Sequence, residues 1–266
     1  MPIPNILSIA GTDPSGGAGI AADLKTFSAL GGYGMAVITA LVAQTTTGVV
    51  EVREVDADFV VKQLITLLDD VRVDAVKVGM LANAPIIEAV AEMLGRYDTG
   101  YLVLDPVMVA KSGDRLLAAP AVAALRERLM PRADLVTPNL SEAADLLGEP
   151  EAADEATMVD QARRLLKHGA RRVLLKGGHM AGSRSRDLLV DENAERWFDA
   201  PRIDTPNTHG TGCTLSSAIA TLRPQRESWS DAVTDAKSYL TEALRTSDRL
   251  TVGHGHGPVH HLHRWT

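Results

Sequence analysis

The chain has a single cysteine, Cys213, and no apolar run that approaches the length of a membrane span. A lone thiol excludes an intrachain disulfide and is typical of a reducing compartment. No charged start followed by an apolar stretch indicates a secretory signal, so we expect a cytoplasmic protein without a membrane partner. Acidic residues outnumber basic ones by 34 to 27, and the net charge of −7 argues against broad nucleic-acid binding. Any anionic substrate must therefore be held by local donors.

Short apolar runs alternate with amphipathic helical stretches over most of the 266 residues. The expected strands are residues 5–10, 35–43, 49–55, 75–78, 101–104, 135–136 and 173–175, with a hairpin at 188–190 and 196–198. The expected helices are residues 18–30, 58–68, 85–94, 120–129, 140–147, 157–167, 214–222 and 229–244. This alternation predicts one α/β domain, residues 1–266, with a mainly parallel sheet covered by helices on both faces. In such folds, ligands bind beyond the carboxyl ends of the strands.

Residues 207–214, Asn-Thr-His-Gly-Thr-Gly-Cys-Thr, place Cys213 after a glycine-rich turn and just before an apolar helix. Such a turn leaves backbone N–H groups unpaired, and together with the helix dipole they form a seat for an anion. A thiol held there is expected to have a lowered pKa and to act as a base or nucleophile, in a setting suited to phosphoryl transfer. An equally open interpretation is that the glycines only start a helix and that Cys213 is a small buried apolar residue.

A second glycine-rich loop, residues 11–19, follows the first expected strand and opens the next helix. Residues 17–22 match a dinucleotide-binding fingerprint, but no acidic residue follows about 20 positions later to hold a ribose. A dehydrogenase is therefore disfavoured, and the glycines favour a small ring lying against the backbone. Asp23 would be a polar contact for that ring, although by itself it fits a solvated helix residue.

Polar residues also follow several other expected strands. Asp105, Asn139 and Glu142 carry the oxygen ligands that suit Mg²⁺, which keeps several waters and takes only one or two protein carboxylates. The alternative is that Asn139 caps the next helix and Glu142 completes a capping box, and the two roles can coexist. Lys176 could reach phosphate oxygens or be an ordinary exposed lysine, and Lys237 in the last helix fits a solvated side chain.

Two segments stay open at this point. Residues 107–116 are polar and follow Asp105 directly, so they form either a flap that excludes water or a plain connection. Five of the eight histidines fall in the last 13 residues. Their irregular spacing and the lack of a nearby cysteine argue against a metal site and favour a disordered tail.

Together these segments resemble the hydroxymethylpyrimidine and phosphomethylpyrimidine kinases of thiamine biosynthesis, a branch of the ribokinase-like superfamily. The matching motifs are residues 10–20, 22–27, 38–44, 77–81, 105–108, 137–143, 176–179, 207–214 and 252–261. The resemblance implies a three-layer α/β/α ribokinase-like fold and an enzyme that forms a homodimer.

The implied activity is ATP- and Mg²⁺-dependent phosphorylation of 4-amino-5-hydroxymethyl-2-methylpyrimidine, first to the monophosphate and then to the diphosphate. The nearest alternative is pyridoxal kinase of the same superfamily, which phosphorylates a hydroxymethyl group on another ring. A non-catalytic pyrimidine- or nucleotide-binding regulator on the same fold is disfavoured, because a regulator needs no base at position 213.

The resemblance also implies roles for individual residues. Cys213 is the general base, where many ribokinase relatives carry aspartate, and the amides of Gly210, Thr211 and Gly212 stabilise the transferring phosphoryl group. The implied pyrimidine contacts are Gly11, Asp23, Gln44, Met80 and Val107. The implied nucleotide contacts are Asn139, Lys176, Thr208 and Lys237, and the implied Mg²⁺ ligands are Asp105 and Glu142. Two departures from the family pattern, Ala21 in place of glutamine and Thr46 in place of asparagine, fall near the expected ring pocket.

Overall fold

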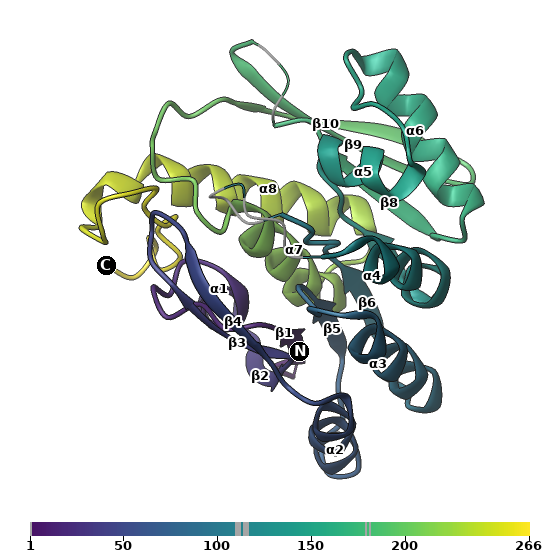
Figure 1. Ribbon diagram of the computed structural model, residues 1–266. Coiled ribbons are helices and arrows are strands. Elements are labelled where there is room, and N and C mark those ends of the chain that lie inside the picture. The colour runs from purple at the N-terminus through teal and green to yellow at the C-terminus, as the bar shows by residue number, and fades with distance from the viewer. Residues whose placement is uncertain (1, 110–112, 114–116, 179, 181) are drawn as a thin grey trace.

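The computed structural model describes residues 2–109, 113, 117–178, 180 and 182–266 of the chain. An eight-stranded sheet runs through its centre in the order β10-β9-β8-β7-β6-β5-β1-β2 (Figure 1). The strands are β1 (Asn5–Ala10), β2 (Tyr33–Ile38), β5 (Ala75–Val78), β6 (Tyr101–Leu104), β7 (Leu135–Val136), β8 (Arg172–Lys176), β9 (Arg184–Asp191) and β10 (Glu195–Pro201). Neighbours from β2 to β8 pair in parallel, and β9 pairs antiparallel with both β8 and β10. The predicted mainly parallel sheet is confirmed.

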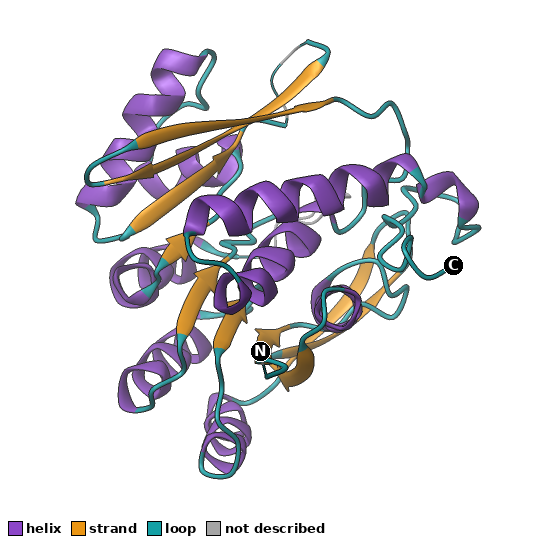
Figure 2. Cartoon of the chain, turned by 180° about the vertical axis from the view of Figure 1, so that it is seen from behind, coloured by secondary structure: helices purple, strands orange, loops and turns teal. Residues whose placement is uncertain are grey.

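Helices cover both faces of this sheet. One face carries α2 (Ala57–Leu68), α3 (Ala84–Arg96), α4 (Ala119–Ala124), α5 (Leu140–Leu147) and α6 (Glu155–Lys167), and the other carries α1 (Gly19–Ala29), α7 (Thr211–Leu222) and α8 (Trp229–Arg245). Figure 2 shows α8 crossing the molecule over the strands. Successive strand side chains point to opposite faces, so Ile6 joins the core with α7 and α8 while Leu7 joins the core with α2 and α3. The three-layer α/β/α prediction is confirmed.

The chain leaves the main sheet at Thr39, which corrects the single strand predicted for residues 35–43. There β2 ends, and β3 (Ala40–Gln44) pairs antiparallel with β4 (Val49–Glu54) in a separate hairpin. The Thr39 hydroxyl donates to the carbonyl of Met80 at 2.8 Å, and the Thr39 carbonyl accepts from the amide of Val55 at 2.9 Å. The apolar run gives no local sign of this bend, because tertiary hydrogen bonds hold it.

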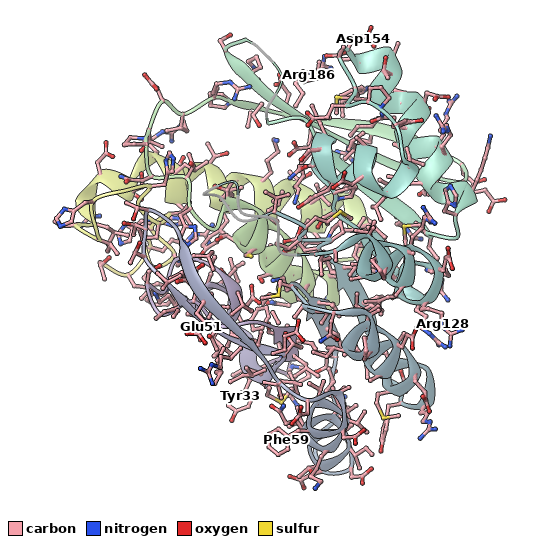
Figure 3. The ribbon with its side chains drawn as sticks, viewed as in Figure 1. Tyr33, Glu51, Phe59, Arg128, Asp154 and Arg186 are labelled. Carbon is pink, nitrogen blue, oxygen red and sulfur yellow. The ribbon has the colours of Figure 1, made fainter. Side chains whose placement is uncertain are left out.

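The hairpin exposes apolar side chains to solvent. Leu41 is 55% exposed and Val50 is 78% exposed, and Tyr33 and Phe59 are exposed as well. Figure 3 shows Tyr33, Glu51 and Phe59 on the same side of the molecule. Exposed apolar residues that gather on one side are typical of an interaction surface.

Helix boundaries near the sheet edge follow local signals. The amide of Glu142 donates to Asn139 Oδ1, and the amide of Asn139 donates to Glu142 Oε2, each at 2.8 Å, so the predicted capping box opens α5. By contrast, α7 begins at Thr211 and not at residue 214, which puts Cys213 within its first turn. The helix predicted for residues 120–129 is α4 followed by a π-helical turn, Leu125–Leu129.

Within the described part of the chain, no helix combines the length and apolarity needed to cross a membrane.

Candidate active site

A cavity of about 450 Å³ opens at the carboxyl ends of the parallel strands. Its wall includes residues close after three strands and the last residue of a fourth, namely Gly11 after β1, Asp105 after β6, Asn139 after β7 and Lys176 at the end of β8. This edge is where an α/β sheet is expected to bind ligands, and the volume suits a small molecule. All of the predicted site residues except Asp23 line this cavity.

The glycine-rich turn forms one part of the wall. Gly210 is the N-cap of α7 with a left-handed φ of 78°, and a Cβ there would lie 1.7 Å from the carbonyl oxygen of Gly17. Both the conformation and the close contact therefore require glycine. Thr211, Gly212 and Cys213 in the first turn of α7 line the cavity, so the amide end of the helix favours an anion there.

Asp23 is fully buried and does not line the cavity, which argues against its predicted contact with the substrate. Its fully buried carboxylate accepts from Lys77 Nζ at 2.9 Å on each oxygen, from Ser8 Oγ at 2.5 Å and from Ser217 Oγ at 2.7 Å. Lys77 is also fully buried but lies on the wall. Burial lowers the pKa of Lys77, but the negative groups around it, Asp23 foremost, carry the pKa above its usual range. The lysine therefore stays charged.

Lys176 joins the two predicted metal ligands. Its Nζ donates to Asp105 Oδ1 at 2.9 Å and lies 3.8 Å from Glu142 Oε2. A Cβ on Gly212 would lie 3.3 Å from the same Nζ, so glycine lets the start of α7 approach this lysine. Burial raises the pKa of Glu142 to about 7, although Lys176 acts in the opposite direction. Burial also acts to raise the pKa of Asp105, but Lys176 and Lys77 together hold that pKa below its usual range.

The carboxylates of Asp105 and Glu142 are the part of the wall that fits Mg²⁺. Both supply carboxylate oxygens, and they share Lys176. The raised pKa of Glu142 indicates that this lysine does not fully offset the burial of its carboxylate. Among the described residues, no group of three or more His, Cys, Asp or Glu side chains is arranged to hold a metal ion. A magnesium ion would therefore take further ligands from phosphate oxygens and water, as Mg²⁺ usually does.

Cys213 is half-buried on the wall, which excludes an inert thiol packed away from the cavity. Its pKa is raised to about 11, which corrects the predicted lowering. Burial is the main cause, and Lys77 lowers the pKa less than burial raises it, while Asp23 and Asp105 raise it further. The helix start is visible in the local sequence, whereas Asp23 and Asp105 come from distant parts of the chain.

Asp13 and His209 connect the two glycine-rich loops, and neither is among the predicted site residues. His209 Nε2 donates to Asp13 Oδ2 at 2.7 Å, and the amides of Gly17 and Ala18 donate to the same oxygen at 3.1 and 2.8 Å. Burial acts to raise the pKa of Asp13, but side-chain hydrogen bonds from His209 and Gln44 hold it well below its usual range. Both residues lie inside the glycine-rich motifs, which is the signal that could have identified them.

Another part of the wall carries a buried ion pair between Lys237 of α8 and Asp187 of β9. Asp187 also accepts from the amide of Gly177 at 3.1 Å. Lys237 and Thr208 were predicted to contact the nucleotide and both line the cavity. Asp187 was missed because its sequence context is that of an ordinary strand residue.

The remaining sequence expectations have mixed outcomes. Val107 lines the cavity, but residues 110–112 and 114–116 of the predicted flap lie outside the described residues. Ala21 and Thr46 do not line the cavity. The expected disordered tail is corrected, because His260 and His261 are only 6% and 4% exposed and pack against the body.

Solved structures assign the class of the fold. The pyridoxal kinase from Staphylococcus aureus, solved with AMP-PCP and pyridoxal, matches with a TM-score of 0.91 at 32% identity and covers 100% of this chain and 96% of that chain. The phosphomethylpyrimidine kinase from Clostridium difficile matches with a TM-score of 0.80 at 41% identity over 91% of this chain and 99% of that chain. The fold is that of the ribokinase-like kinases, as predicted.

Sequence comparison then identifies the family. Residues 13–260 match the phosphomethylpyrimidine kinase family. The hydroxymethylpyrimidine/phosphomethylpyrimidine kinase of Escherichia coli (strain K12) is 59% identical over 98% of each chain, and that of Rhizobium meliloti (strain 1021) is 52% identical over 97% of each chain. The chain belongs to the phosphomethylpyrimidine kinase family, which confirms the resemblance.

Proposed function

We propose that this protein uses ATP to phosphorylate 4-amino-5-hydroxymethyl-2-methylpyrimidine, first on the hydroxymethyl group and then on the resulting phosphate. The observation that carries the proposal is that Cys213 and the first turn of α7 line one cavity together with the expected ring contacts other than Asp23. The name of the E. coli relative supports both acceptors, and a matching thiamine biosynthesis protein of Geobacter sulfurreducens, 49% identical over 98% of this chain, supports the pathway. The S. aureus complex with AMP-PCP supports ATP as the donor.

The pyrimidine ring lies between Gly11, Met80 and Gln44 in this proposal. A Cβ on Gly11 would lie 2.6 Å from Met80 Cε, so a larger residue there would have to displace the end of the methionine side chain. Val107 covers the ring from the side of Asp105. The Gln44 side chain binds both Asp13 and the polar edge of the ring, so Asp13 orients the Gln44 amide toward the ring.

Cys213 takes the proton of the hydroxymethyl group as the new bond to phosphorus forms. With a pKa of about 11, only about one thiol in ten thousand is ionised at pH 7. The rare thiolate is a strong base. The positive charge of Lys77 stabilises it and lowers the pKa of Cys213. The rate of the first phosphorylation should therefore rise as the pH rises above neutrality.

The amides of Gly210, Thr211 and Gly212 stabilise the negative charge on the transferring phosphoryl group. Lys176 lies against Gly212 and adds a positive charge at the same place. Asn139, Thr208 and Lys237 contact the nucleotide, and Asp105 and Glu142 hold Mg²⁺. When bound, the ion neutralises charge on the phosphate oxygens.

The second phosphorylation places a different demand on the site. Its acceptor is a phosphate, which is already ionised and attacks without losing a proton to Cys213. The same amides and Lys176 still have to hold the transferring group, so this step depends on the turn more than on the thiol.

Pyridoxal is the competing substrate, because several of the matching structures are pyridoxal kinases. ADP release is measured side by side with the pyrimidine alcohol and with pyridoxal at equal concentrations. The proposal expects a higher kcat/KM for the pyrimidine. A higher kcat/KM for pyridoxal would assign the protein to vitamin B6 phosphorylation, and pyrimidine binding without ADP release would indicate a regulator.

The exposed apolar side chains of the β3–β4 hairpin support a homodimer. Leu41 and Val50 lie on the same two-stranded unit as Gln44, so a partner seated on it would also steady one wall of the cavity. The low cysteine content supports a cytoplasmic location.

A further inference from the structure

Residues 253–261, the C-terminal strap, run from the tip of the β3–β4 hairpin to the helices beneath the glycine-rich turn. Figure 1 shows the C-terminal segment beside this hairpin tip. The strap is part of a motif that the sequence analysis left without a role, and it contains four of the clustered histidines, His254, His256, His260 and His261. It contacts both the hairpin that carries Gln44 and the glycine-rich turn that carries Cys213.

The first end of the strap is attached to Thr46. Thr46 Oγ1 accepts from the amides of His254 and Gly255 at 3.2 and 3.0 Å, and the Thr46 carbonyl accepts from the amide of His256 at 3.1 Å. A Cβ on Gly253 or on Gly255 would lie 2.2 Å from an oxygen of Thr46, so the close approach needs glycine at both positions. Thr46 stands two residues after Gln44 on the same hairpin.

The middle of the strap is attached to the glycine-rich turn. The amide of His209 donates to the carbonyl of Gly257 at 3.0 Å, while the His209 side chain holds Asp13 at 2.7 Å. A Cβ on Gly257 would lie 2.1 Å from Asn207 Oδ1. The strap therefore packs directly against the start of the segment that leads to Cys213.

The last residues of the strap are anchored in the core. Thr214 Oγ1 donates to the carbonyl of Gly210 at 2.8 Å, so His261 Nε2, 3.1 Å away, donates to the same hydroxyl. Tyr239 donates its hydroxyl proton to the carbonyl of His261 at 2.6 Å, and Val259 is fully buried. Burial lowers the pKa of His261 to about 3, so the imidazole is neutral and this contact does not change near pH 7.

We propose that the C-terminal strap fixes the hairpin that carries Gln44 relative to the turn that carries Cys213, and that Thr46 and His209 are positioning residues for phosphoryl transfer. The inference rests on the proposed function. Gln44 and Cys213 come from separate parts of the fold, and the strap bonds to the hairpin of the first and to the turn of the second. A displacement of about 1 Å between reacting groups can slow a reaction by about a hundredfold, so such a connection has a direct effect on rate.

The test uses Thr46→Val, which keeps the shape of the side chain and removes the hydroxyl that accepts two strap amides. Thr47→Val is the matched control, because the Thr47 hydroxyl bonds to Thr45 at 2.8 Å within the same turn, and its loss leaves the hydrogen bonds between Thr46 and the strap in place. Thr46→Ser restores the hydroxyl. We expect Thr46→Val to lower kcat about tenfold, equivalent to about 1.4 kcal/mol, with KM for the pyrimidine within about twofold. The serine variant should recover most of the rate, and the control should match the wild type.

A second readout does not depend on kinase activity. Cys213 is the only thiol in the sequence and lies on the cavity wall, so the rate of its alkylation by iodoacetamide reports how accessible the turn leaves it. Thr46→Val should be alkylated at least about threefold faster than Thr47→Val at equal pH. If Thr46→Val unfolds, Gly255→Ala provides the same test, because its Cβ would be forced to within 2.2 Å of the Thr46 carbonyl oxygen.

Equal kcat and equal alkylation rates for the Thr46 and Thr47 variants would overturn the inference. So would a variant that loses only thermal stability while kcat, measured well below its unfolding temperature, stays at the wild-type value. A wild-type protein that phosphorylates no pyrimidine would refute the proposed function, and the alkylation comparison would still decide whether the strap restrains the turn.

Discussion

Replacing Asp23 with asparagine should destabilise the protein without abolishing substrate binding. The carboxylate is fully buried, accepts from Ser8 and Ser217, and pairs with Lys77 at 2.9 Å. The substituted amide would keep one acceptor oxygen but would turn an NH₂ group or a neutral oxygen toward a buried ammonium group. Removing one partner of a buried ion pair costs about 3–5 kcal/mol, because the remaining charge has no compensation.

This loss is a large part of the total stability of a domain, which is about 5–15 kcal/mol. Urea unfolding followed by circular dichroism measures it as a lower midpoint. Asp199→Asn is the matched control, because Asp199 pairs with Arg184 at the surface, where the side chains are 43% and 51% exposed. Solvent already screens that pair, so its midpoint should not change.

The double variant Asp23→Asn, Lys77→Met should be more stable than Asp23→Asn alone, because the uncompensated buried charge is gone. The reasoning is refuted if Asp23→Asn unfolds at the same urea concentration as Asp199→Asn. A raised KM for the pyrimidine with unchanged stability would instead restore the direct ring contact that the sequence predicted.

Three further predictions concern the thiol and the hairpin. The alkylation rate of Cys213 should keep rising through pH 9 toward pH 11, because its raised pKa keeps the thiolate scarce at lower pH, and a plateau below pH 8 would contradict this. Cys213→Ala should slow the first phosphorylation more than the second in separate turnover assays, because only the alcohol must lose a proton, and equal losses would remove the base from the account. Leu41→Glu should yield monomers in sedimentation velocity experiments, whereas an unchanged mass would move the dimer interface elsewhere or exclude a dimer.

Local patterns predicted the elements whose cause is local. The strand–helix alternation identified the parallel sheet, and the Asn139–Glu142 spacing identified the capping box that opens α5. The rule that ligands bind at the carboxyl ends of strands correctly predicted that Gly11, Asp105 and Lys176 line one cavity.

Apart from the shifted start of α7 and the π-helical turn after α4, the errors involve contacts between distant residues. Asp23 appeared available to a ring because its partner Lys77 lies 54 positions away. The pKa of Cys213 was expected to fall because the helix start is visible in the sequence, whereas the burial and carboxylates that raise it are not. The break at Thr39 likewise depends on a hydrogen bond to Met80. The histidine-rich tail is held by hydrogen bonds to Thr46. Neither contact can be read from the local sequence pattern.

The central claim is that one cavity transfers phosphate twice to a pyrimidine alcohol. The direct measurement is mass spectrometry of the products formed by the purified protein with ATP, Mg²⁺ and 4-amino-5-hydroxymethyl-2-methylpyrimidine. We predict that the monophosphate forms first and is converted to the diphosphate, with one ADP released for each phosphate added. ADP release without any phosphorylated pyrimidine, or phosphorylation of pyridoxal alone, would contradict the account.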